Sequence, residues 1–103
     1  MSTLSEINFN YQRAVKQAGQ LESVAGKLKK AAEQNMEGIL NDVYRAWKSD
    51  NSGQYIKKGQ KVEQDIKTCA RNLTEIARAI RTIAERVRQA ELEAWRIANE
   101  RSH

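Results

Sequence analysis

The sequence predicts an all-α fold in which two long helices form an antiparallel hairpin, and two such hairpins pair into a four-helix bundle. Three observations point to this class. The 103 residues contain no proline and are 40% hydrophobic and 30% charged, a composition typical of long helices and coiled coils. Apolar residues recur every three or four positions in both halves, as in amphipathic helices. One run of turn-forming residues near the middle interrupts this pattern. A length of 103 residues predicts a single domain, 1–103.

The first helix is expected over about residues 5–47. Its apolar positions alternate by four and three and then resume after a slip: Ile7, Tyr11, Ala14, Ala18, Leu21, Ala25, Leu28 and Ala32, then Met36, Leu40, Val43 and Trp47. Successive spacings of four around Ala32 and Met36 are a stutter, which locally unwinds a supercoil. The sequence therefore predicts a local change of helical winding near these residues.

The turn is expected at about residues 48–52, within the run from Lys48 to Gly53. Serine, asparagine, aspartate and glycine favour turns and supply caps for the helix that follows. A connection this short makes neighbouring helices antiparallel. Trp47 and Tyr55 flank it, and we expect them to form a hydrophobic clasp at this end of the hairpin.

The second helix is expected over about residues 52–100 and carries an unbroken 3.5-residue repeat. With heptad positions lettered a to g, the a positions are Ile66, Leu73, Ile80, Val87 and Ala94, and the d positions are Val62, Cys69, Ile76, Ile83, Ala90 and Ile97. The e positions are Glu63, Ala70, Ala77, Ala84, Glu91 and Ala98. An apolar a/d/e face is wider than a two-stranded seam needs and suits a bundle.

Two helices cannot cover such a face, so the sequence predicts that the remainder pairs with a second hairpin. The face assigned to this contact comprises Ile66, Leu73, Ala77, Ile80, Ala84 and Val87, with the alanines at the seam. The second hairpin is either another copy of the chain or a different one. Cys69, at a d position, is expected to be a small buried hydrophobic residue.

Basic residues form the other notable pattern, with a net charge of +5 that lies mostly in residues 52–103. Seven of them are assigned to an outer, solvated face of the second helix: Lys57, Lys61, Lys67, Arg71, Arg78, Arg81 and Arg88. Such a face permits contact with nucleic acid or another anionic surface. No aromatic residues interleave with these bases, which disfavours nucleic acid as the partner.

Nothing in the sequence predicts an enzyme, a cofactor or a metal. The only histidine is the terminal His103 and the only cysteine is Cys69, which together cannot make a structural zinc site. Phosphate loops and nucleophile motifs are absent. No Sec-type signal peptide and no apolar run of membrane-spanning length occur.

The stretch from Ala46 to Tyr55, AWKSDNSGQY, resembles the turn of the WXG100, or ESAT-6-like, family of type VII secretion substrates. In that family a Trp-x-Gly turn is followed by small residues and by an aromatic eight positions after the tryptophan. Trp47, Gly53 and Tyr55 match this pattern, whereas Ser49 stands where the family has glycine. The length and the central position of the motif also agree with the family.

The resemblance implies a small protein made in the cytoplasm of a Gram-positive bacterium and secreted without a Sec signal peptide. It further implies a secretion ATPase as one partner. The other is this chain itself, a second WXG100-like or helical protein, or the N-terminal helices of a secreted toxin.

The family's export signal ends in Tyr-x-x-x-Asp/Glu, and no tyrosine follows Tyr55 here. Trp95 with Asn99 and Glu100 gives a degenerate form of that signal. The resemblance therefore leaves two roles open, a secreted substrate or a targeting partner whose mate carries the signal. An alternative from another class is a cytoplasmic coiled-coil regulator, or nucleic-acid-associated protein, that uses the basic face.

Overall fold

The computed structural model describes residues 3–47 and 50–101, except for the side chains of residues 43, 44, 46, 47 and 50–52. In this part of the chain the structure is helical and contains no strand. The all-α class predicted from composition and periodicity is therefore confirmed.

The first helical run comprises α1 (Leu4–Lys30), a π-helical segment (Ala31–Met36) and α2 (Glu37–Trp47), and the second is α3 (Asp50–Arg101). Both runs match the predicted helices to within two residues. The largest difference is that α3 begins at Asp50 instead of about residue 52. The first amides of a helix have no intrahelical acceptors, so polar and small residues are tolerated there as well as in a turn.

A capping box that the sequence analysis missed fixes the start of α1. The backbone N–H of Glu6 donates to Thr3 Oγ1 (3.2 Å), and the Thr3 hydroxyl donates to Glu6 Oε1 (3.0 Å). The N–H of Ile7 donates to the Thr3 carbonyl (3.0 Å). Threonine followed three residues later by glutamate is a readable signature of a helix start.

The π-helical segment coincides with the stutter. A π turn closes i→i+5 hydrogen bonds and so holds one more residue than an α turn. That extra residue absorbs the slip in the apolar repeat, because Ala32 is buried and both Met36 and Leu40 remain half-buried. The structure thus accommodates the stutter with a π-helical segment.

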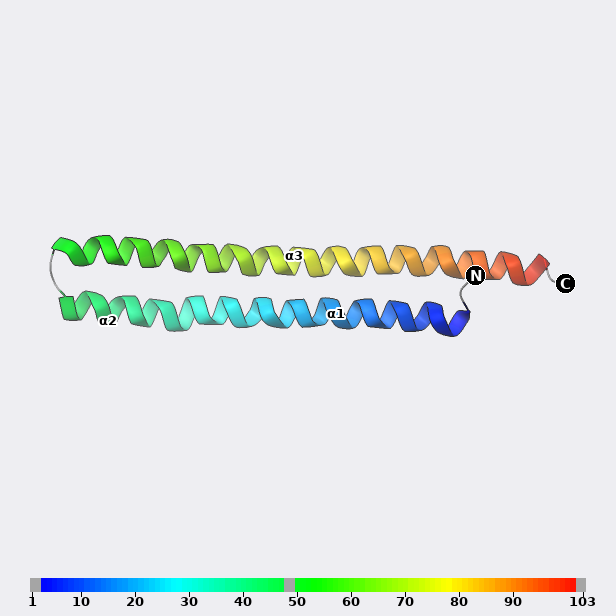
Figure 1. Ribbon diagram of the computed structural model, residues 1–103, viewed down its shortest axis with the longest axis horizontal. Helices are drawn as coiled ribbons and strands as arrows, with labels where there is room; N and C mark the ends of the chain where they lie inside the picture. The colour runs from blue at the N-terminus through cyan, green and yellow to red at the C-terminus, as the bar shows by residue number, and fades with distance from the viewer. Residues whose placement is uncertain (1–2, 48–49, 102–103) are drawn as a thin grey trace. The chain divides into compact units, whose positions relative to one another are not determined.

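The chain divides into two compact units, and the division falls inside α1 and α3. Unit 1 comprises Met1–Leu21 and Glu75–His103, and unit 2 comprises Glu22–Thr74. Within each unit a segment of the first helical run lies antiparallel to a segment of α3 (Figure 1).

Small residues dominate the buried positions of both units. Unit 1 buries Ile7 (2% exposed), Ala18 and Ala77 (both 0%). Unit 2 buries Ala25, Ala32, Ala70 and the carboxylate residue Glu63. Alanines at the contact let two helices approach closely, so the e positions of α3 face the chain's own first helical run.

The assignment of the alanines to a contact with a second hairpin is therefore corrected. Ala77 has no exposed surface in the single chain and Ala84 is half-buried. The physical reason is the size of the side chains. Helices that pack on alanine can lie closer together than helices that pack on isoleucine, so the alanine edge of α3 meets the first helical run.

One close approach in unit 2 requires glycine. A methyl group added at Gly59 would overlap Cδ2 of Leu40 and would lie 3.3 Å from its Cγ. Gly59 therefore lets the leucine side chain pack directly on the α3 backbone.

Candidate functional site

The d positions of α3 are exposed in both units. In unit 1 they are Ile76 (50% exposed), Ile83 (58%), Ala90 and Ile97 (38%), here called the outer stripe. In unit 2 the equivalent residues are Val62 (47%) and Cys69. Cys69 was expected to be buried, and this is wrong because its heptad position points away from the first helical run.

The a positions lie between the outer stripe and the alanine contact. Ile66, Leu73 and Ile80 are half-buried, whereas Val87 is 47% exposed. Of the six residues predicted for the bundle face, Val87 thus has the most free surface. Four large apolar side chains of α3 in unit 1, those of Ile76, Ile83, Val87 and Ile97, are open to a partner.

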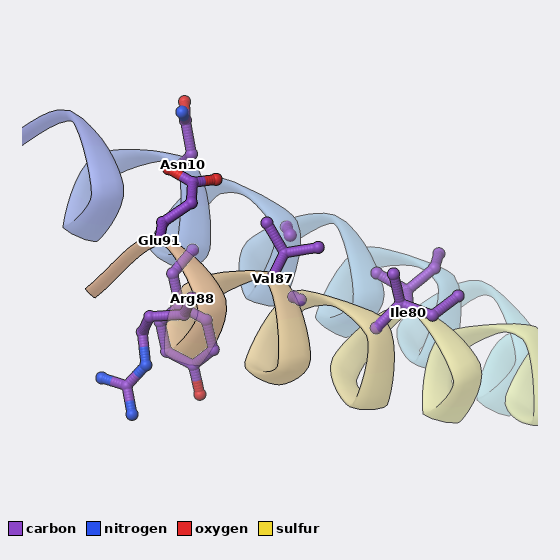
Figure 2. A pocket seen from close by; sticks show the side chains of 9 residues that line it. Asn10, Ile80, Val87, Arg88 and Glu91 are labelled. Atoms are coloured by element: carbon purple, nitrogen blue, oxygen red, sulfur yellow. The ribbon is translucent and has the colours of Figure 1, made fainter. Parts of the chain in front are cut away.

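A groove of about 270 Å³ opens beside these residues in unit 1. Its lining comes from α1 (Asn10, Tyr11, Ala14) and from α3 (Ile80, Ile83, Ala84, Val87, Arg88, Glu91). Figure 2 shows Ile80 and Val87 along the α3 side, with Asn10, Arg88 and Glu91 toward one end. The groove is therefore lined by apolar side chains along most of α3 and by polar side chains at one end.

The polar end is organised by Arg88. Its guanidinium lies over the Tyr11 ring at 4.5 Å from the centroid, and its Nη2 donates to Glu85 Oε1 at 2.9 Å. The cation–π interaction joins α1 to α3, whereas the ion pair lies within α3. Two buried atoms here lack a hydrogen-bond partner, Arg88 Nε and Glu91 Oε2.

The ion pair shifts the pKa values of both Glu85 and Arg88. The hydrogen bond from Arg88, helped by one from Gln89, holds the pKa of the Glu85 carboxyl below its usual range. The hydrogen bond to Glu85 raises the pKa of Arg88. The sequence analysis missed this network because it placed Arg88 on the solvated face.

The Glu85 pair predicts an acid-sensitive contribution to stability. A carboxyl whose pKa is lower in the folded chain stabilises the fold above its unfolded pKa, and this contribution is lost as the pH falls through the folded pKa. We expect Glu85→Gln to lower the thermal midpoint at pH 7, and the difference from the natural chain to shrink by about pH 2.5. Thermal denaturation followed by circular dichroism at both pH values measures it. An equal difference at both values would show that Glu85 acts by packing alone.

Of the predicted turn motif, the structure places Gly53 and Tyr55. Both lie in the first turns of α3, and Tyr55 is 56% exposed. Gly53 is exposed, and no glycine in the described part of the chain has a positive φ. The Trp47 side chain and all of Ser49 lie outside the described residues, so the proposed clasp between Trp47 and Tyr55 stays a prediction.

The residues of the degenerate export signal lie in the last turns of α3. Trp95 is half-buried, whereas Asn99 and Glu100 are exposed. Arg96 binds Glu100 (2.6 Å) and also Glu93, whose pKa the Arg96 hydrogen bond lowers. Glu100 is thus part of an ion-pair network at the surface. Ion pairs between exposed side chains contribute little to stability.

The predicted basic face is divided in the structure. Lys57, Lys61, Arg71 and Arg78 are exposed. Lys67 is half-buried and pairs with Glu63 at 3.1 Å, and the hydrogen bond to Glu63 raises the Lys67 pKa. Because Arg81 and Arg88 are also half-buried, the assignment of all seven cations to one solvated face is wrong.

Residues 3–47 and 50–101 contain neither of two other kinds of site. No group of three or more histidine, cysteine, aspartate or glutamate side chains is arranged to hold a metal ion. None of the helices described combines the length and the apolar character needed to cross a membrane.

Comparisons of the chain with protein-family models, with curated proteins and with solved structures give no match. The resemblance carried by Trp47, Gly53 and Tyr55 therefore stays a prediction.

Proposed function

We propose that the chain is a helical binding module of the WXG100 type, a small secreted substrate or targeting partner of a Gram-positive type VII secretion system. The observation that carries the proposal is the exposed apolar surface of unit 1, formed by Ile76, Ile83, Val87 and Ile97. Large aliphatic side chains at heptad spacing on a helix suit burial against another helix. The function is accordingly to bind, and the proposal assigns no catalytic group.

Binding in this proposal uses different parts of the chain for different partners. The outer stripe pairs with a second helical hairpin, which completes a bundle. The turn end, with Trp47 and Tyr55, is presented to the secretion ATPase. The segment from Trp95 to Glu100 serves as a degenerate export signal or is complemented by the signal of a mate. The protein is made in the cytoplasm and leaves it without a Sec signal peptide.

Export is the direct test. The tagged chain is expressed in its host with and without the secretion ATPase, and the culture supernatant is compared with the cells. We expect ATPase-dependent appearance outside the cell and its loss in Trp47→Ala, while Phe9→Ala, a change at an exposed aromatic residue far from the turn in sequence, should leave export intact. Retention inside the cell under all conditions, also when candidate partner hairpins are co-expressed, would overturn the proposal.

The alternative is a regulator that binds anionic polymers, and the four exposed cations Lys57, Lys61, Arg71 and Arg78 favour it. Binding through phosphate contacts weakens steeply as salt rises. DNA retention at low salt that Arg71→Glu with Arg78→Glu abolishes would support this role. If DNA is still retained after both changes, the exposed cations of α3 are not the cause of binding.

A further inference from the structure

We propose that the groove of unit 1 binds a small aliphatic amine. The alkyl chain of this ligand lies along Ile80, Ile83 and Val87, and its ammonium group donates a hydrogen bond to Glu91. The inference goes beyond the proposed binding of a second hairpin, since it assigns a small molecule to one groove. It rests on a carboxylate oxygen without a partner, on the apolar lining beside it, and on the size of the groove.

Glu91 supplies the polar anchor of this site. Its side chain is half-buried, and its Oε2 is shielded from solvent without a hydrogen-bond partner. Glu91 also takes part in no ion pair within the part of the chain that the structure describes. A buried acceptor without a donor lowers stability. A ligand that brings an N–H group to this oxygen therefore gains a hydrogen bond that the chain itself does not supply.

Arg88, which also lines the groove, does not neutralise this carboxylate. Its Nη2 donates to Glu85, and its guanidinium lies over the Tyr11 ring. Figure 2 shows the guanidinium and the Glu91 carboxylate pointing in opposite directions. Arg88 Nε lacks a hydrogen-bond partner as well, but Glu85 already balances the charge of Arg88, whereas no described cation pairs with Glu91. Charge complementarity at this end therefore favours a cationic head group.

Asn10 adds a second acceptor at the same end of the groove, where Figure 2 places it with Glu91. Its amide oxygen is able to accept a hydrogen bond, and an ammonium group has three hydrogens to donate. The polar end thus offers acceptors from both α1 and α3 to one head group.

The rest of the lining suits one alkyl chain. Figure 2 shows Val87 and Ile80 leading away from the polar end along α3. Ile83 is 58% exposed and Val87 is 47% exposed, so a ligand here removes apolar surface from water. The groove volume of about 270 Å³ lies just below the roughly 300–1,000 Å³ typical of small-molecule pockets. A single chain fits this volume better than a system of several rings.

Probes that share one chain and differ in the head group test the assignment. Octylamine, octanol and octanoate are titrated into the full chain, and the methyl resonances of Ile80, Ile83 and Val87 are followed by NMR, with those of Ile39 in unit 2 as the internal control. We expect octylamine to bind roughly tenfold more tightly than octanol, because a charge-assisted hydrogen bond is stronger than a neutral one. Octanoate should bind most weakly. The net charge of +5 favours octanoate in general, so the expected order has to come from Glu91.

Two other orders of affinity would contradict the proposal. Equal binding of octylamine and octanol would show that the groove does not recognise the head group. Tighter binding of octanoate would assign the polar end to the donor on Arg88. Shifts at Ile39 that match those in the groove would show that the probes bind to apolar surface in general.

Two substitutions locate the ligand, each with a matched control. Glu91→Gln should lower the affinity for octylamine to that for octanol, whereas Glu75→Gln, at an exposed carboxylate of α3 outside the groove lining, should not. Val87→Trp should fill the groove and abolish binding of all three probes. Val62→Trp adds the same ring in unit 2 at an equally exposed valine (47% for both) and should bind as the natural chain does. An unaltered preference for octylamine in Glu91→Gln would overturn the assignment of the head group.

Chain length distinguishes a free amine from a lysine side chain of another protein. Butylamine has the same four-carbon stem and ammonium group as lysine, and octylamine extends further along the groove. We expect affinity to rise by at least about twofold for each added methylene, since full burial of a methylene is worth up to about fourfold. Equal binding of butylamine and octylamine would overturn the assignment to a free amine.

Ligand binding and the pairing of hairpins are separable by experiment. Ile83 and Val87 belong both to the groove and to the surface proposed for a second hairpin. The titrations are therefore repeated with Ile76→Glu, which places a charge on the outer stripe beyond the groove lining. Binding by this variant alone would support the inference and show that pairing covers the groove in the natural chain. Absence of binding in both chains would overturn the inference whether or not the chain is exported, and binding in a chain that is never exported would overturn only the secretion role.

Discussion

Replacing Ala77 with glutamate is expected to unfold unit 1. Ala77 has no exposed surface, so the larger side chain would either force the helices apart or bury its carboxylate where the neighbouring residues are apolar. Overpacking alone typically costs about 1–3 kcal/mol, and an unpaired buried charge costs more. A domain of this length has only roughly 5–15 kcal/mol of stability to lose. We expect a cost of at least about 3 kcal/mol.

Urea denaturation followed by circular dichroism measures this loss, and Ala79→Glu is the matched control. Ala79 is exposed and lies two residues away on the same helix, so the same change there should leave the midpoint almost unaltered. If both variants unfold at the midpoint of the natural chain, Ala77 does not face the first helical run. The prediction also changes how binding experiments are interpreted, since loss of a partner in Ala77→Glu would follow from unfolding.

The helices were predictable because each of their signals is local. Periodicity, absence of proline and one polar turn place both helical runs to within two residues. The stutter between Ala32 and Leu40 marked the place of the π-helical segment in the sequence. A π-helical turn holds one more residue than an α turn and so takes up a slip of about one residue. The capping box at Thr3 and Glu6 was equally readable, and the sequence analysis overlooked it.

The pairing of faces was not predictable from periodicity alone. An a/d/e face presents two apolar edges, and the pattern does not say which edge meets the chain's own partner helix. Here the e edge, with Ala70 and Ala77, is buried and the d edge, with Ile76 and Ile83, is open. A signal was present in the sequence, since alanines also recur every seven residues at Ala18, Ala25 and Ala32.

The same rotation explains the other corrections. When α3 turns its e edge inward, the d residue Cys69 becomes exposed. Lys67, one residue beyond an a position, becomes half-buried beside that edge. Arg88 moves onto the Tyr11 ring. Each of these residues was assigned correctly to a helix and wrongly to a face, because a face is defined only by the helix that packs against it.

Replacing Ile83 with glutamate is expected to abolish self-association and leave the hairpin folded. Ile83 is 58% exposed, so the single chain loses little buried surface. A bundle of two copies would place both substituted side chains in an apolar seam, each with an unpaired charge. We expect association to weaken by at least about 100-fold, which corresponds to about 2.7 kcal/mol. Sedimentation equilibrium gives the association constant, and circular dichroism verifies the fold.

Ile39→Glu provides the matched control for this last prediction, because Ile39 in α2 is similarly exposed (56%) and belongs to unit 2. It adds the same charge to a different face, so a general effect of charge on a basic chain would weaken both variants alike. Loss of association in Ile83→Glu alone assigns the interface to the outer stripe. Loss in Ile39→Glu alone would move the interface to unit 2. Because both changes lie at exposed positions, neither result is confounded by unfolding in the way that a change at Ala77 would be.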